Sequence, residues 1–100
     1  MIRHIVMWTL REQAEGADKA SNLLQAKALL LSCAQVVPGI HTFEVATDTP
    51  GMDCTHDLVL HMLVDDAQVL AAYQNHPDHL AIKPFMKSVV QERHCMDFKV

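Results

Sequence analysis

Hydrophobic and polar positions change their spacing along the chain in a way that predicts alternating strands and helices. The first segment, Ile2–Leu10, is rich in β-branched and apolar residues, which favours a strand. The polar residues 11–16 that follow predict a loop. Apolar residues then recur at helical spacing from Leu23 to Ala34, with Asp18 as the expected N-cap. Pro38–Gly39 is expected to stop this helix.

The second half of the chain repeats the pattern of strand and helix. Ile40–Thr47 and Thr55–Val64 are predicted strands. Asp65–Asp66 is typical of a helix start, and helical spacing follows it. Arg93–Val100 is expected to be the closing strand. The resulting order, β-α-β-β-α-β, is that of a ferredoxin-like α+β fold with an antiparallel sheet.

The predicted strands are apolar on both faces, which is typical of strands that are buried on both sides. In the first strand Val6 and Trp8 share one face with His4, whereas Ile5 and Met7 share the other. Two helices cover only one face of a four-stranded sheet. We therefore expect a second copy of the chain to cover the other face, which gives a homodimer through the open sheet face.

Composition narrows the classes of function. The chain has 100 residues, of which 50% are hydrophobic and 20% are charged, so we expect one globular domain over residues 1–100. Its eight Lys and Arg residues are scattered and its net charge is -4, so we expect no nucleic acid partner. No apolar stretch is long enough to span a bilayer, which argues against a membrane partner. Three cysteines without paired spacing, and no signal-peptide pattern, predict reduced thiols and a cytoplasmic location.

The segment between Tyr73 and His79 carries the densest candidate chemistry. It places a phenol and two imidazoles around Pro77, which interrupts the helical pattern. Histidine titrates near neutral pH and transfers protons, and tyrosine orients or donates a proton, so the pair is a candidate acid–base site. Helix capping is the alternative: the polar residues around Pro77 cap two helix segments, and Tyr73 fills the core. Both interpretations stay open on spacing alone.

The remaining motifs do not predict a cofactor or a metal. His4 and His56 lie early in two predicted antiparallel strands, so we expect them toward opposite ends of the sheet. A buried histidine is most often simply hydrogen-bonded. The chain has no closed Cys/His ligand set and no Gly-rich phosphate loop, so we expect neither a metal nor a cofactor.

Several segments together resemble the stress-responsive A/B barrel (Dabb) domain family over nearly the whole chain. They are the opening Ile2–Val6, the break Val37–Ile40, and the segments His56–Leu60, Ala72–His79 and Met96–Phe98. The resemblance implies a ferredoxin-like fold. It also implies a homodimer whose two sheets form a barrel, a dimeric α/β barrel.

The resemblance also implies an activity, because the family includes a plant polyketide cyclase that uses no cofactor. The catalytic Tyr and His of that cyclase match Tyr73 and His79 in this chain. Its two pocket histidines match His4 and His56. The implied function is a small lyase, cyclase or isomerase that acts on a carbonyl compound. The substrate-binding residues expected on this basis are His4, Val6, Trp8, Leu30, His56, Leu58 and Ile82.

Other functions stay open beside this enzyme. One is a non-catalytic oligomer with a stress-related or ligand-carrying role, and another is a monooxygenase of the related dimeric α+β barrel families. Two positions also differ from the cyclase: Lys83 replaces a small residue and Arg93 replaces an apolar lining residue. The sequence therefore does not identify the substrate.

Overall fold

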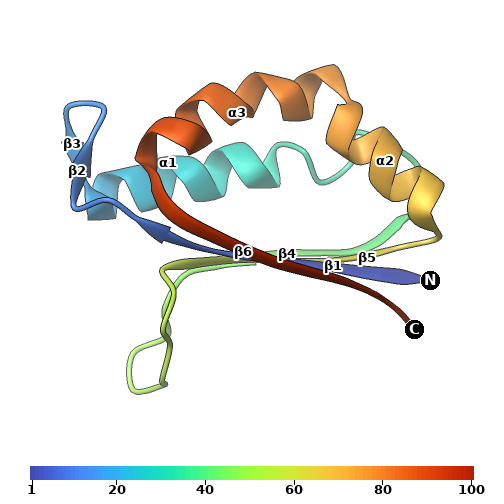
Figure 1. The fold of residues 1–100 in the computed structure, drawn as a ribbon, viewed down its shortest axis with the longest axis horizontal. Helices are drawn as coiled ribbons and strands as arrows, with labels where there is room; N and C mark the ends of the chain where they lie inside the picture. Colours follow the sequence, from blue (N-terminus) through green and yellow to red (C-terminus); the bar gives the residue numbers. More distant parts are fainter.

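Four long strands form one antiparallel sheet in the computed structural model, which describes all residues 1–100 (Figure 1). They are β1 (Ile2–Leu10), β4 (Ile40–Ala46), β5 (Leu58–Val64) and β6 (Val90–Lys99), and their order across the sheet is β4-β5-β1-β6. The central strand β1 pairs with both β5 and β6, so the first and last strands of the chain lie side by side. The predicted ferredoxin-like α+β fold is confirmed.

Three helices cover one face of this sheet (Figure 1). They are α1 (Lys19–Leu31), α2 (Ala67–Asn75) and α3 (Pro77–Val89). Asp18 and Asp66 are the N-caps of α1 and α2, and each side chain accepts a hydrogen bond from a backbone N–H of the first turn. The predicted helix starts are confirmed. No helix combines the length and the apolar character that a membrane span requires.

The predicted interruption at Pro77 is a junction between two separate helices. His76 ends α2 and is also the N-cap of α3, where its Nδ1 accepts a hydrogen bond from the N–H of Asp78 at 3.1 Å. Pro77 occupies the first helical position, where its missing N–H costs no hydrogen bond. The capping interpretation is therefore confirmed for His76.

The segment predicted as a loop after β1 contains a short hairpin, so that prediction was wrong. Its strands are β2 (Gln13–Ala14) and β3 (Ala17–Asp18). The two turn residues, Glu15 and Gly16, both have positive φ, at 53° and 71°. Two such residues in a row match the two-residue turn whose twist suits a hairpin. The side chain of Asn22 in α1 donates a hydrogen bond to the carbonyl of Ala14 and holds the hairpin against the helix.

Strand β5 begins at Leu58, three residues later than predicted. Asp57 interrupts the regular ladder with β1: its backbone N–H bonds to the carbonyl of Trp8, and its Oδ2 accepts from the N–H of Leu10 at 2.8 Å. The two-residue alternation of side chains therefore does not extend back to His56. Strand β6 begins at Val90, three residues earlier than predicted, directly where α3 ends.

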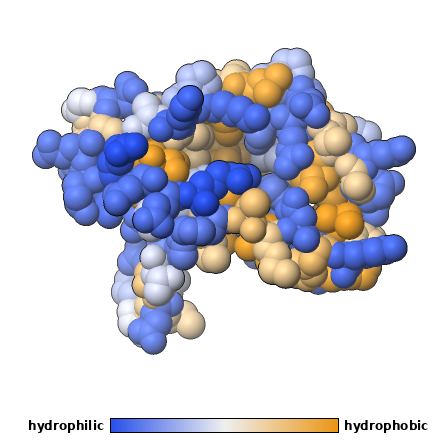
Figure 2. Space-filling view, viewed as in Figure 1, coloured by the Kyte–Doolittle hydropathy of each residue, from blue (hydrophilic) through white to orange (hydrophobic).

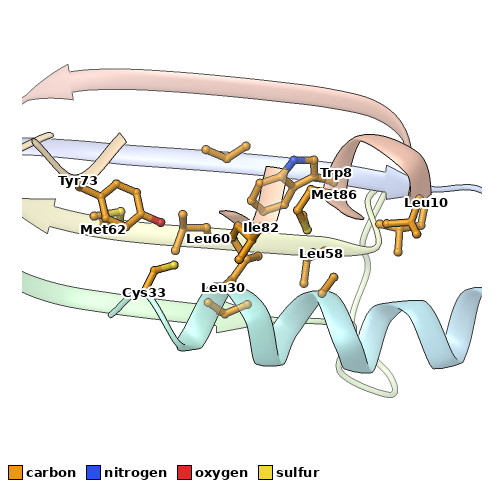
Figure 3. Packing of buried hydrophobic residues seen from close by; sticks show 14 of the residues in the cluster. Trp8, Leu10, Leu30, Cys33, Leu58, Leu60, Met62, Tyr73, Ile82 and Met86 are labelled. Atoms are coloured by element: carbon orange, nitrogen blue, oxygen red, sulfur yellow. The ribbon is translucent and has the colours of Figure 1, made fainter. Parts of the chain in front are cut away.

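The core lies between the sheet and the helices (Figure 3). It contains sixteen buried apolar residues. Those from the sheet are Val6, Trp8, Leu10, Val45, Leu58, Leu60, Met62 and Val64. Those from the helices and the segment after α1 are Ala26, Leu30, Cys33, Leu70, Tyr73, Ile82, Met86 and Val89. The core therefore occupies only the helix-covered face.

The opposite face of the sheet, here called the open face, has no helix against it (Figure 1). The pairing register places Ile5, Met96, Met7 and Val59 on this face. Met7 and Met96 are 37% and 67% exposed. Polar groups lie among them: Arg3 and Glu44 each bond to the ring of His61, at 3.0 Å. The open face is thus a mixed apolar and polar surface without a partner within the chain.

Candidate functional site

A cavity of about 990 Å³ opens between helix α3 and strands β1 and β6. Figure 2 shows its opening as a hollow with hydrophobic residues on its floor. Its apolar wall consists of Val6, Trp8, Leu30, Leu60, Leu80, Ile82, Pro84, Met86 and Val90. Its polar lining residues are His4, Gln74, Asn75, His79, Lys83, Lys87, Gln91 and Arg93. A space of this size is typical of a small-molecule site.

His79 lies on the cavity wall in the first turn of α3, where it is half-buried. Its Nδ1 is 3.0 Å from the carbonyl oxygen of Gln74. A carbonyl only accepts hydrogen bonds, so Nδ1 carries the proton and Nε2 keeps a free lone pair. Burial lowers the pKa of His79, and the positive charges of Lys83 and Arg93 lower it further. The neutral ring is therefore a proton acceptor at neutral pH.

Tyr73 lies in α2, completely buried beside His79. The centroids of the two rings are 4.6 Å apart and the planes are tilted by 55°. Its hydroxyl oxygen is buried and makes no hydrogen bond, the only such side-chain atom in the chain. Figure 3 shows this hydroxyl pointing into the core toward Leu60, which lines the cavity. Burial also raises the pKa of Tyr73, so the phenol keeps its proton and is a donor without a partner.

His4 is the second histidine on the cavity wall, and it is 3% exposed. Its Nδ1 is 2.5 Å from Oδ1 of Asp97, which is its cross-strand neighbour in β6. A carboxylate on one ring nitrogen fixes the orientation of the ring and leaves the other nitrogen for a ligand. Asp97 was not predicted as a site residue, because its pairing with His4 appears only once the β1–β6 register is known.

Most of the predicted substrate-binding residues line the cavity, but two do not. Val6, Trp8, Leu30, Ile82 and His4 line it. Leu58 is buried in the core behind the wall, at 2% exposure.

His56 lies elsewhere, because the ladder is interrupted at Asp57. Its Nε2 is 3.1 Å from Nδ1 of His94, a residue that faces the open side of the sheet opposite Met7. The structure therefore does not bring His56 together with His4, and their expected separation along the sheet is confirmed.

The other reactive groups of the chain do not add to this cavity. Cys33 is buried in the core, and burial raises the pKa of its thiol, which disfavours the thiolate form. Cys54 and Cys95 are exposed and unpaired. No group of three or more His, Cys, Asp or Glu residues lies arranged to hold a metal ion.

Comparison with known proteins gives a family match over almost the entire chain. The family model described as the Stress Responsive A/B Barrel Domain, Dabb, matches residues 2–100. A search of curated protein sequences gave no match. The matched range includes all the strands and helices that form the cavity.

Solved structures with the same fold come from several bacteria. A dimeric protein of unknown function with a ferredoxin-like fold from Bacteroides fragilis is 23% identical, with a TM-score of 0.81, covering 99% of this chain and 95% of that one. A dimeric ferredoxin-like protein of unknown function from Thermobifida fusca is 20% identical, with a TM-score of 0.82 and coverages of 99% and 90%. A Dabb family protein from Mesorhizobium loti is 25% identical, with a TM-score of 0.69 and coverages of 99% and 95%.

Proposed function

The chain belongs to the stress-responsive A/B barrel (Dabb) domain family, and on this premise we propose that it is an enzyme that works without a cofactor. The proposed activity is that of a small lyase, cyclase or isomerase acting on a carbonyl compound. Tyr73 and His79 are its acid–base pair. The cavity between α3 and the sheet binds the substrate.

One observation carries this proposal: the Tyr73 hydroxyl is buried without a hydrogen-bond partner, next to His79. A buried polar group left unpaired costs about 1–3 kcal/mol. Leu60, toward which the hydroxyl points, lies between it and the cavity, so the proposal includes a shift of Leu60 that lets a bound carbonyl oxygen supply the missing acceptor. The hydroxyl gains most when that oxygen becomes negatively charged, because hydrogen bonds to charged oxygens are stronger.

The proposed chemistry is removal of a proton next to the carbonyl. Nε2 of His79 takes the proton from the carbon, and the electron pair of the broken C–H bond moves into the enolate. The enolate oxygen accepts a hydrogen bond from the Tyr73 hydroxyl. In an isomerisation the proton returns from His79 to a different carbon of a conjugated enolate. In a cyclisation the enolate carbon bonds to a second carbonyl carbon, the π electron pair of that carbonyl moves to its oxygen, and the resulting alkoxide takes the proton from His79. The apolar walls exclude water and strengthen the oxyanion hydrogen bond.

We also propose that the chain forms a homodimer through its open face. Ile5, Val59 and Met96 leave apolar surface there, which a second copy would remove from water. The related proteins from Bacteroides fragilis and Thermobifida fusca are described as dimeric. The cavity opens on the other side of the sheet, so dimerisation leaves it accessible.

A ligand-binding protein without catalysis is the second candidate. The observation that favours it is the enclosure of Tyr73, whose hydroxyl lies in the core and not on the cavity wall. Under this alternative the cavity binds a small molecule, but no proton transfer follows.

The experiment that separates the two candidates is hydrogen exchange in deuterated buffer, followed by NMR. The probes are 4-oxononanoate and its methyl ester, two stable ketones with exchangeable protons next to the carbonyl. Exchange faster than in buffer, lost in His79→Ala, is expected for the enzyme. Binding of a probe without any faster exchange would instead identify a carrier.

A further inference from the structure

The cavity is positively charged although the protein is not. The whole chain has 12 acidic residues, eight Lys and Arg, and a net charge of -4. Among the lining residues Lys83, Lys87 and Arg93 are cationic, and no Asp or Glu is present. The net charge of the lining residues is therefore positive, whereas that of the whole chain is negative.

These three cations have no acidic partner. None of them takes part in an ion pair, whereas Lys19 outside the cavity pairs with both Glu12 and Asp57. The only ion pair that includes a lining residue joins His4 to Asp97, and its carboxylate is bound to the imidazole at 2.5 Å. The positive charge at the cavity is thus not neutralised within the chain.

The cations come from two opposite walls. Lys83 and Lys87 are four residues apart in α3, so they lie on one face of the helix in successive turns and repel each other. Arg93 lies across from them in β6, directly opposite Trp8 of β1 in the sheet. All three cations line the same cavity, and Lys83 and Arg93 both lie close enough to His79 to lower its pKa.

We propose that the ligand is an amphipathic anion, whose apolar chain and carbonyl group occupy the cavity while an anionic group binds Lys83, Lys87 and Arg93. Carboxylate is the form we test. The proposal rests on the proposed function, because it names the class of carbonyl compound on which that site acts. An apolar wall with a cationic opening matches both parts of such a molecule. The planar guanidinium of Arg93 suits a carboxylate, which it binds through two parallel hydrogen bonds.

Trp8 makes the test direct, because it is the only tryptophan of the chain and it lines the cavity. Its fluorescence is titrated with 4-oxononanoate and, as the neutral match, with methyl 4-oxononanoate. The acid is expected to bind more tightly than the ester, and added salt is expected to weaken the binding of the acid but not that of the ester. Each of Lys83→Gln, Lys87→Gln and Arg93→Gln should raise the dissociation constant of the acid by about fivefold, the effect of one close charge in water.

Lys99→Gln is the matched control, because it removes the same charge from the far end of β6, outside the cavity. It should leave the affinity for both probes unchanged. Equal affinity for acid and ester, or no change in the three cavity variants, would overturn the proposal.

The exchange experiment distinguishes this failure from failure of the proposed function. Charge-dependent binding of the acid without faster exchange contradicts the catalysis and supports the anion site. Equally fast exchange of the acid and the ester at concentrations well below saturation supports the catalysis and contradicts the anion site.

Discussion

The two faces of the sheet carry similar pairs of side chains in different surroundings. Each face carries a histidine bound to a carboxylate, His4 with Asp97 on the covered face and His61 with Glu44 on the open face. His4 is 3% exposed and borders a cavity. His61 also contacts Arg3, and it does not line the cavity. An imidazole–carboxylate pair is therefore a candidate for binding or catalysis only where its surroundings allow it, here beside a cavity that has an apolar wall and a second histidine.

The largest expected effect is a difference between substitutions of His76 and His79, two histidines on the helix-covered side of the sheet. His79→Ala should lower the exchange rate of the ketone probes by about 100-fold or more, because it removes the proposed general base. His76→Ala is the matched control, since His76 caps α3 and does not line the cavity. The control should lower the melting temperature through a lost cap, worth about 1 kcal/mol, without a comparable loss of rate. A large loss of rate in His76→Ala, with little loss in His79→Ala, would contradict the proposed role of His79.

The next prediction concerns the open face. Ile5→Asp should raise the dissociation constant of the dimer by about tenfold to a hundredfold, because it buries an unpaired carboxylate. Leu24→Asp is the control: Leu24 is 74% exposed on α1, in the helix layer, and its substitution should leave the dimer intact. Sedimentation velocity measures both variants. A stable monomer of the unmodified protein at micromolar concentration would contradict the proposed dimer.

Tyr73→Phe tests the role of the Tyr73 hydroxyl on the covered face, because it removes only that hydroxyl. The exchange rate should fall about tenfold, as expected for loss of one hydrogen bond to a charged oxygen. The melting temperature should stay the same or rise, because the variant removes a buried hydroxyl that has no partner. A fall in melting temperature with an unchanged rate would show that the phenol has a purely structural role.

The smallest expected effect is the change of the exchange rate and of the free energy of unfolding with pH. The pKa of His79 is lowered below its ordinary value of 6.5, chiefly by burial. The exchange rate should therefore rise with pH and reach half its maximum below pH 6.5, measured with the ketone probes. The contribution to stability has the same sign. Below pH 6.5 the unfolded chain binds the proton more readily than the folded one, so the free energy of unfolding falls as pH drops through this region. A midpoint above 6.5 would contradict the burial of a neutral imidazole.

Local sequence signals predicted most of the fold. Asp18 and Asp66 cap helices as expected, because their carboxylates bond to N–H groups of the same turn. The hairpin at Glu15 and Gly16 escaped prediction, because a glutamate rarely adopts positive φ and does not signal a turn.

The site was harder to predict because its contacts join distant segments. The family resemblance placed His56 among the substrate-binding residues, but the irregular pairing of Asp57 puts His56 beside His94 on the open face. Asp97 was missed because only the β1–β6 register brings it to His4. The uncompensated charges of Lys83 and Arg93 likewise become visible only when the cavity brings the helix and the strand together.

The pairing of the first strand with the last has a consequence for when the cavity forms during folding. Hairpin β4–β5 closes a short loop and forms at little entropic cost, whereas β1 and β6 are joined by a loop that includes almost every other element. His4 meets Asp97 across 93 positions of sequence. During synthesis we therefore expect the His4–Asp97 pair and the cavity wall that contains Arg93 to assemble last, after the helices have been made. A nascent chain therefore contains Tyr73 and its histidines before β6 completes the cavity, and we expect ligand binding only after β6 has paired with β1.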